Sequence, residues 1–428
     1  MALGAGAPAE GARRPSAAWI LALATLAQMG SSLAQQGMIV LVVYFRTLDH
    51  LSLVAMGAVA AAPPLGTMLG MTPAGAAVDR GGVGRTALFG TLGMVVAVVL
   101  LFLATPGPVL LLVALLAALG VCAAVMPMAG AAAALWASRP EHRSTAMGIR
   151  QSGVTIGAAI AAATLPTLEA VWGLRLVILA LALPVAVFGT LLARLPSTLR
   201  AQAEAGTAAG GRATRPAVQR TPLGALAPVL PVAVAGALLA AGQYDTLAYA
   251  ITYLHVDAGL ALATAGAVLA FAQVGGTLAR VGVGVFADRT RLHTGHALML
   301  MISLGLVSLS VFSAFPQAPL WVWLLLALAL GMGAIGWNAL VLQWAAERAT
   351  PGAQATAMGI CGTGVFLGAT IFPPLFGAVS TATSLAMAWR SVALLYAIAL
   401  ALVVATMRRL DRPRGAGPTL PAVDVAGH

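Results

Sequence analysis

The pentapeptide TAMGI occurs twice in this chain, at Thr145–Ile149 and again at Thr356–Ile360. The two copies are 211 residues apart (356 − 145 = 211). The glycines that follow keep this offset: Gly153 with Gly364, and Gly157 with Gly368. Chance can produce one such match in a chain rich in small residues, so an internal repeat needs a second match.

A longer stretch upstream supplies that match. Residues 36–80 align without a gap on residues 245–289, at an offset of 209 (245 − 36 = 209). The identical pairs include Tyr44/Tyr253, Gly57/Gly266, Gly66/Gly275, Gly75/Gly284, Asp79/Asp288 and Arg80/Arg289. Both matches come in the same order at nearly the same offset. The chain is therefore expected to consist of two related halves.

The composition indicates an all-α membrane protein. Hydrophobic residues make up 60% of the 428 residues and charged residues 8%, against about 25% charged residues in a soluble domain. Apolar runs recur from Trp19 to Met407, and each can cross a hydrocarbon core of about 30 Å as a helix. Cys122 and Cys361 lie inside such runs and suggest neither a disulfide nor a metal site.

Turn signals and charges divide the chain into twelve expected transmembrane helices. The first apolar stretch continues to Tyr44, which is too long for the core of a signal peptide, so we expect it to be retained as a membrane span. The expected spans are about 17–45, 52–78, 86–105, 108–137, 145–170, 173–195, 225–254, 260–287, 294–314, 318–346, 355–378 and 385–407.

Arginine orients these spans, because basic residues collect on the cytoplasmic side. All 23 basic residues are arginines. With both termini inside, the cytoplasmic arginines are Arg13, Arg14, Arg80, Arg85, Arg139, Arg143, Arg194, Arg200, Arg212, Arg215, Arg220, Arg289, Arg291, Arg348, Arg408, Arg409, Arg412 and Arg414. Only Arg46, Arg175 and Arg390 fall outside, and Arg150 and Arg280 fall within the membrane. The sequence thus predicts a protein of the bacterial cytoplasmic membrane with cytoplasmic termini, whose positive charge does not imply a nucleic-acid partner.

A polar stretch separates the halves. Residues 196–223 are rich in Gly, Ala, Thr and Pro with scattered Arg, which is typical of a flexible linker. We expect an N-terminal six-helix bundle at 1–195, a cytoplasmic linker at 196–224, a C-terminal six-helix bundle at 225–407 and a cytoplasmic tail at 408–428. Two six-helix repeats in the same orientation are the architecture of secondary transporters, with the binding site between the halves near the bilayer midplane.

The segment GAAVDRGGVGR, Gly75–Arg85, resembles the G-x-x-x-D-R-x-G signature of the major facilitator superfamily. The segment GVFADRTR of the second half is similar to it in degenerate form. Val83 and Gly84 stand where the family has its first basic residues, and Arg291 stands where it has glycine. The resemblance implies the two-bundle fold and assigns gating of the cytoplasmic face to Gly75, Asp79, Arg80, Arg85, Asp288 and Arg289. Alternatively, Asp79 and Arg80 are a charge pair that ends a helix.

Arg280 is the most informative polar residue. It precedes Asp288 by eight residues, which is about 12 Å along a helix at 1.5 Å per residue. A charge near the midplane needs a wet cavity or a partner. Its counterpart in the first half is Met71 (280 − 209 = 71), so the shared scaffold does not require an arginine there. We expect Arg280 to bind the solute, with a structural salt bridge to Asp245 as the alternative.

Asp245 is the one acid that we place well inside a span. Burial favours the protonated form of a carboxyl group, so Asp245 is a candidate for proton coupling. An ion pair with Arg280, or contact with water at the outer end of the seventh span, are the alternatives. Arg150 lies only about 9 Å from the start of the fifth span. Its side chain is therefore expected either to bind the solute or to extend to the cytoplasmic surface.

Further polar side chains are candidates for lining the solute site. They are Gln28, Gln35, Tyr244, Gln273, Trp337 and Asn338. The alternative for the residues of the first span is hydrogen bonding between helices, since small and polar residues commonly mediate such contacts in membranes.

Arg150 and Arg280 place two positive charges within the membrane, and Asp245 places one acidic group there. This balance favours an anionic solute, since a guanidinium binds a carboxylate bidentately. This arrangement is similar to that of monocarboxylate transporters and of cyanate-permease-like members, and implies a symporter of small organic anions. The alternative is a drug/proton antiporter. Antiporters usually carry an arginine four residues before a glycine of the fourth span, and this chain has Leu116 at that distance from Gly120. They also carry a proline in the fifth span, at the position where this chain has Ala158. We find no pattern for an enzyme, a channel, a metal or a cofactor, and expect a monomer in contact with membrane lipid.

Overall fold

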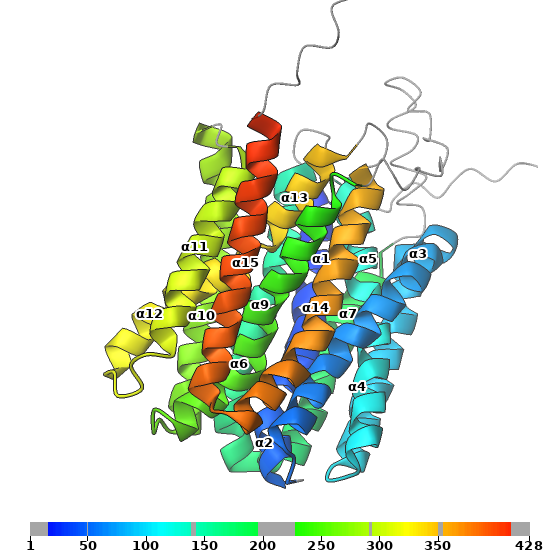
Figure 1. The fold of residues 1–428 in the computed structure, drawn as a ribbon. Coiled ribbons are helices and arrows are strands. Elements are labelled where there is room, and N and C mark those ends of the chain that lie inside the picture. The colour runs from blue at the N-terminus through cyan, green and yellow to red at the C-terminus, as the bar shows by residue number, and fades with distance from the viewer. Residues whose placement is uncertain are drawn as a thin grey trace, which may run out of the picture.

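The computed structural model describes residues 16–48, 50–137, 143–195, 227–290, 293–349 and 354–411. Every regular element in these ranges is a helix (Figure 1). The first half contains α1 (Ala17–Val40), α2 (Val42–Leu48), α3 (Leu53–Ala104), α4 (Val109–Ala123), α5 (Val125–Ala137), α6 (Arg143–Ala180) and α7 (Ala182–Ala193). The second half contains α9 (Leu230–Val256), α10 (Leu262–Thr290), α11 (Thr294–Phe312), α12 (Leu320–Ile335), α13 (Asn338–Arg348), α14 (Gln354–Ala382) and α15 (Leu385–Asp411).

Two of these helices each contain a sharp turn between two spans. The turns lie at Gly82 in α3, with φ 76°, and at Gly173 in α6, with φ 75°. Glycine adopts such positive φ angles without the steric cost that a Cβ atom brings. Conversely, α1 with α2, α4 with α5, and α12 with α13 are each one span with a break in it.

Ten helical stretches of the described chain are long and apolar enough to cross a membrane. One of them, Ala146–Ala193, contains the turn at Gly173 and therefore counts as two spans. The helix α9 is not among the ten, although its 27 residues suffice in length. With α9 the described residues form twelve crossings, as the sequence predicts, and the chain is an integral membrane protein.

Equivalent glycines make equivalent contacts in the two halves. A Cβ atom on Gly120 of α4 would overlap the carbonyl oxygen of Pro63 in α3, and one on Gly331 of α12 would overlap that of Ala272 in α10. Both contacts are related by the repeat (331 − 120 = 211; 272 − 63 = 209). The helix axes can approach this closely only where no side chain intervenes. The halves are thus built on the same helix packing.

The TAMGI repeat marks a second duplicated contact. Behind the first copy, a Cβ atom on Gly153 of α6 would lie 2.6 Å from the carbonyl oxygen of Thr25 in α1. Behind the second copy, a Cβ atom on Gly364 of α14 would lie 2.9 Å from that of Ala233 in α9. Each half therefore packs its first helix against its fifth through the same glycine.

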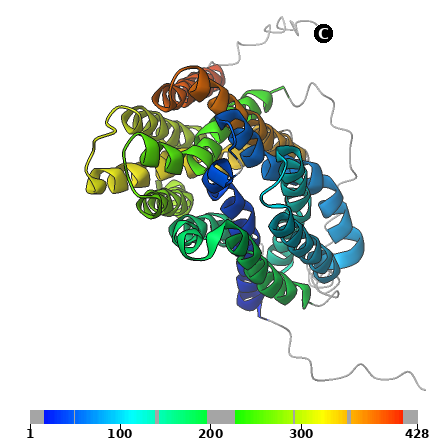
Figure 2. The same ribbon diagram turned by 90° about the horizontal axis from the view of Figure 1, so that it is seen from below.

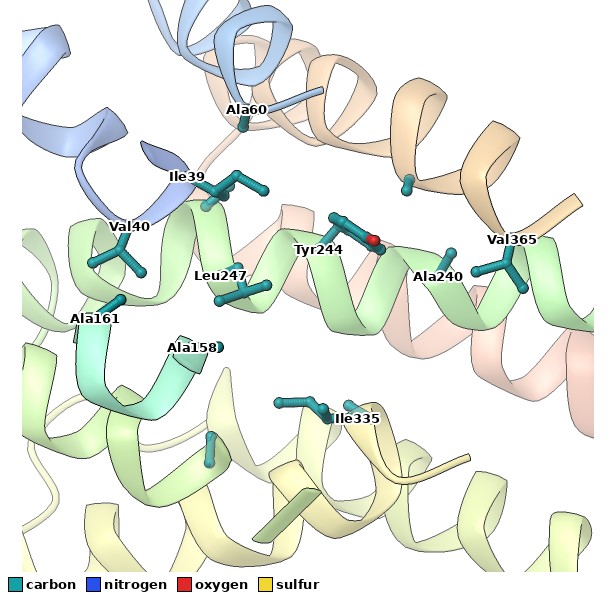
Figure 3. Packing of buried hydrophobic residues seen from close by; sticks show 14 of the residues in the cluster. Ile39, Val40, Ala60, Ala158, Ala161, Ala240, Tyr244, Leu247, Ile335 and Val365 are labelled. Atoms are coloured by element: carbon teal, nitrogen blue, oxygen red, sulfur yellow. The ribbon is translucent and has the colours of Figure 1, made fainter. Parts of the chain in front are cut away.

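The helices α1 and α9 occupy the centre of the molecule (Figure 2). Every residue from Leu239 to Leu254 of α9 is buried, and so is every residue from 36 to 45 across α1 and α2. Figure 3 shows Tyr244 of α9 among apolar residues of both halves, including Ile39 and Ile335. Because protein surrounds residues 239–254 of α9, this part of the helix can carry polar residues that lipid-facing helices lack.

The two halves meet along α3 with α14 and along α6 with α10. We refer to the end of the bundle that contains α2 as the Arg46 end, and to the end that contains the turn at Gly82 as the Arg80 end. Near the Arg46 end the contacts are tight, because Cβ atoms on Gly57 and Gly266 would overlap or touch backbone oxygens of the opposite half. Cβ atoms at Gly75 and Gly282, toward the Arg80 end, would meet nothing within 4 Å.

The division of the chain at 195 and 225 stays a prediction. The linker expected at 196–224 and most of the expected tail at 408–428 lie outside the described residues.

Candidate functional site

Arg280 is held by a break in a neighbouring helix. Its Nε and Nη2 atoms donate hydrogen bonds to the carbonyl oxygen of Ile335, at 3.3 and 3.1 Å. Ile335 is the last residue of α12, and the chain turns at Gly336 and Trp337 before α13 begins. The carbonyl groups of a last helical turn lack intrahelical partners and carry partial negative charge, so they accept from a cation favourably.

The remaining nitrogen of this guanidinium is free to bind a ligand. Nη1 of Arg280 has no hydrogen-bond partner among the described residues, and the side chain is half-buried. Arg280 interacts electrostatically with Tyr244 of α9, whose hydroxyl group lies beside the side chain of Gln36 in α1. The arrangement therefore brings one group from the first half and two from the second to one place.

Asp245 follows Tyr244 in α9 and is buried. Its exposed fraction is 1%, and its Oδ1 atom has no hydrogen-bond partner. Within the described ranges no ion pair joins Asp245 to Arg280, whose hydrogen bonds go to Ile335 instead. Asp245 instead interacts electrostatically with Tyr249 and Tyr396. A buried carboxyl oxygen without a donor is costly, and in a membrane it marks a candidate functional group.

Arg150 lies inside the first half, buried at 3% exposure. Its Nη1 atom donates a hydrogen bond of 2.9 Å to Oε1 of Gln28 in α1. Its Nε atom is buried without a partner. The side chain therefore lies between α6 and α1 and does not extend to the surface.

The other expected site residues differ in how fully their polar atoms are occupied. The amide of Gln35 donates to Thr67 and the indole of Trp337 donates to the carbonyl oxygen of Ala334, so both are committed within their own half. Gln273 is buried with its Nε2 atom unpartnered, which leaves it available. Asn338 is half-buried at the start of α13.

Gln36 belongs to this site although the sequence analysis did not select it. It is buried, its Oε1 atom has no partner, and it lies beside Tyr244. Its repeat counterpart is Asp245 (245 − 36 = 209). A polar residue at the position equivalent to a candidate site residue was the signal that could have identified it.

The expected gate lies around the turn in α3. Arg80 and Arg85 are exposed, and the guanidinium carbon of Arg85 lies 5.8 Å from the centre of the Phe89 ring. Gly75 lies one turn before Asp79 in the same helix. The side chains of Asp79, Asp288 and Arg289 lie outside what the structure describes.

Among the described residues no group of three or more His, Cys, Asp or Glu side chains could hold a metal ion.

The sequence profile of the Major Facilitator Superfamily matches residues 20–360. The chain belongs to this superfamily. It is therefore a transporter of a small-molecule solute and not an enzyme.

Solved transporter structures share this superfamily fold. A structure of the nucleoside transporter NupG has a TM-score of 0.71 at 14% identity, covering 90% of this chain and 99% of its own. A bacterial homolog of the human lysosomal transporter Spinster, inward-facing and unoccupied, gives 0.71 at 16% identity over 94% and 100%. A D-xylose–proton symporter gives 0.70 at 17% identity over 91% and 96%. Comparison with curated protein sequences gives no match.

Proposed function

We propose that this superfamily member moves a small organic anion, such as a monocarboxylate, by alternating access. The observation that carries the proposal is the state of Arg280. Two of its nitrogens are fixed on the Ile335 carbonyl oxygen, while Nη1 has no partner among the described residues. A fixed guanidinium with a free nitrogen is a prepared site for a carboxylate, because little further ordering is needed when the ligand binds.

The groups beside Arg280 support a carboxylate ligand. The hydroxyl group of Tyr244 can donate to its second oxygen, and the amide of Gln36 can contact the solute from the first half. Gln273 offers an unpartnered amide nitrogen on the same helix as Arg280. Arg150, held by Gln28, adds positive charge in the first half. A solute that contacts both halves can couple its binding to their relative movement.

Asp245 is the group that we assign to proton coupling. It is buried on α9 directly after Tyr244, and its Oδ1 atom has no donor. A carboxyl group in this position can carry a proton in one state of the transporter and release it in another. With an anionic solute, uptake of one proton makes the combined load neutral, which favours symport.

We further propose that the Arg80 end faces the cytoplasm of a bacterium, with both termini on that side. The positive-inside rule supports this, because Arg80, Arg194 and Arg348 lie toward this end whereas Arg46, Arg175 and Arg390 lie toward the other. The tight contacts at Gly57 and Gly266 and the open space at Gly75 then correspond to a state open to the cytoplasm. The gate would comprise Gly75, Asp79, Arg80, Arg85, Asp288 and Arg289, in a transporter that works as a monomer.

A ligand screen by thermal shift of the purified protein tests the proposal. Small monocarboxylates are compared with cationic drugs, D-xylose and nucleosides. We expect the carboxylates to raise the unfolding temperature, and Arg280→Lys to weaken this effect about tenfold or more in ligand concentration, because lysine keeps the charge but loses the planar fork. Arg175→Lys is the matched control, since Arg175 is an exposed arginine that also donates to a backbone carbonyl group, that of Phe102.

Stabilisation by cationic drugs alone would contradict the proposal and favour the drug/proton antiporter. A second outcome that contradicts it concerns Asp245. If Arg280 serves only to balance this carboxylate, the double variant Arg280→Ala with Asp245→Ala recovers both stability and transport.

A further inference from the structure

A cavity lies at the side of the first half, away from the residues around Arg280. Its volume is about 550 Å³, and its lining comes only from residues 70–125, in α3, α4 and α5. It therefore lies between the two spans of α3 and the span formed by α4 and α5, at the Arg80 end. The helices α3 and α4 lie at the right edge of the bundle in Figure 1. No residue of the second half contributes, so this cavity is separate from the solute site.

The cavity combines a cationic rim with an apolar wall. Arg80 and Arg85 stand at the turn between the two spans, and Phe89 and Val121 line the wall below them. All four side chains are exposed, Phe89 at 63% and Val121 at 40%. Exposed apolar side chains on a membrane-spanning helix face lipid, so the cavity opens toward the bilayer.

The two guanidinium groups on the rim have no acidic partner among the residues that the structure describes. Neither Arg80 nor Arg85 makes a hydrogen bond or an ion pair with any described residue, and the one contact of Arg85 is with the ring of Phe89. Arginines at the membrane surface attract anionic headgroups. A positive rim above an apolar wall matches one ligand, a lipid with a negative headgroup and an acyl chain.

The equivalent place in the second half differs at two of the positions that line this cavity. Gly93 packs on Cys122 in the first half as Gly305 packs on Gly333 in the second (305 − 93 = 212; 333 − 122 = 211). At the same offset of 212, Ala297 stands in the place of Arg85, and Ile302 in that of Gly90. Ala297 and Ile302 are buried, at 2% and 0% exposure. Arg85 and Gly90 are therefore particular to the first half, whereas Arg80 has a counterpart in Arg289.

We propose that this cavity binds one anionic phospholipid from the leaflet at the Arg80 end. The headgroup phosphate lies between Arg80 and Arg85, and an acyl chain lies along Phe89 and Val121. The proposal does not rest on the identity of the transported solute. Because the lipid lies between the two spans that Gly82 joins, it braces the turn that also carries the gating signature.

Native mass spectrometry of the full-length protein tests this site. The protein is released from mixed micelles that contain phosphatidylglycerol and phosphatidylcholine with identical acyl chains, in equal amounts. We expect one phosphatidylglycerol to be retained in preference to phosphatidylcholine. The variant Arg80→Ala with Arg85→Ala should bind it about 30-fold more weakly, since each arginine near an anionic surface contributes roughly a factor of five.

A second variant fills the cavity and keeps its charges. Ala77 lines the cavity and is exposed, so Ala77→Leu should displace part of the acyl chain and weaken binding about tenfold. This variant decides the question if the double arginine variant does not fold. Arg175→Ala is the control, because Arg175 also contacts a phenylalanine ring, that of Phe102, at the opposite end. It should retain the lipid fully.

Three results would overturn the proposal. The first is equal retention of phosphatidylcholine and phosphatidylglycerol, and the second is unchanged retention of phosphatidylglycerol in Ala77→Leu. The third is displacement of the lipid by glycerol phosphate alone at the same concentration, which would indicate a phosphate site without an acyl-chain groove. The readout is the mass of bound lipid and not transport. Failure here would therefore leave the proposed solute site untouched, and failure of the solute screen would leave the lipid site untouched.

Discussion

In the first half Gly120 of α4 packs on the backbone of Pro63, and in the second half Gly331 of α12 packs on that of Ala272. The polar residues do not follow this symmetry. Met71 stands at the position equivalent to Arg280 (280 − 209 = 71), and the buried Cys361 at that equivalent to Arg150 (361 − 150 = 211).

The comparison shows which residues the fold constrains. A side chain at a glycine where two backbones touch separates the helices, so glycine stands at 120 and at 331. A side chain that faces the space between the halves can change without disturbing that packing. Arg280 and Asp245 have no identical counterpart in the first half, and we expect the solute specificity to depend on them.

The largest effect should come from breaking the shared contacts. Gly120→Leu and Gly331→Leu each place a side chain into a facing backbone carbonyl group, and each should cost at least about 3 kcal/mol of folding free energy. We expect loss of folded protein in both cases, measured as the monodisperse fraction in size-exclusion chromatography.

The control for these variants is Gly362→Ala, because a Cβ atom there meets nothing within 4 Å. It should fold normally, and alanine even favours the helix over glycine. If Gly331→Leu is lost but Gly120→Leu is tolerated, the two contacts are not equivalent in energy and the symmetry of the scaffold is only apparent.

The next effect should separate the two deep arginines. Arg280→Ala should lower solute affinity about 100-fold, since hydrogen bonds to charged groups are worth up to about 3 kcal/mol, with little change in unfolding temperature. Arg150→Ala should lower affinity less, about tenfold, and should also cost about 2 kcal/mol of stability, because the buried Gln28 loses its donor. Ligand titration and thermal unfolding on the same samples measure both. An unfolding temperature unchanged in Arg150→Ala would show that this arginine does not support the first half.

Much of this fold follows from the sequence, because its determinants are local. Apolar length defines the spans, and the repeated glycines report the helix contacts of both halves. The acceptor for Arg280 could not be foreseen in this way. It is the backbone carbonyl group of Ile335 at a break within one span, and no side chain in the sequence announces it. The same limit applies to the lateral cavity, which depends on how closely the two spans of α3 approach α4.

The smallest effect concerns the closed Arg46 end. There the contact of α3 with α14 differs from the contact of α6 with α10. The hydroxyl group of Tyr249 shares its proton between the carbonyl oxygens of Leu53, at 2.9 Å, and Pro373, at 2.8 Å, and so joins α9, α3 and α14. The equivalent residue of the first half is Val40 (249 − 209 = 40), whose side chain has no hydrogen-bond donor.

Tyr249→Phe removes this bridge and should shift the transporter toward the state in which the Arg46 end is open. A hydrogen bond contributes about 1 kcal/mol net, so the ratio of open to closed states should rise about fivefold. Spin labels at Val54 of α3 and Ala382 of α14, both exposed, report the distance by electron resonance after both native cysteines are replaced by alanine. The matched control is Tyr253→Phe, because the hydroxyl group of Tyr253 is buried without a partner and its loss breaks no hydrogen bond. Equal shifts in both variants would mean that tyrosine packing, and not the bridge, keeps this end closed.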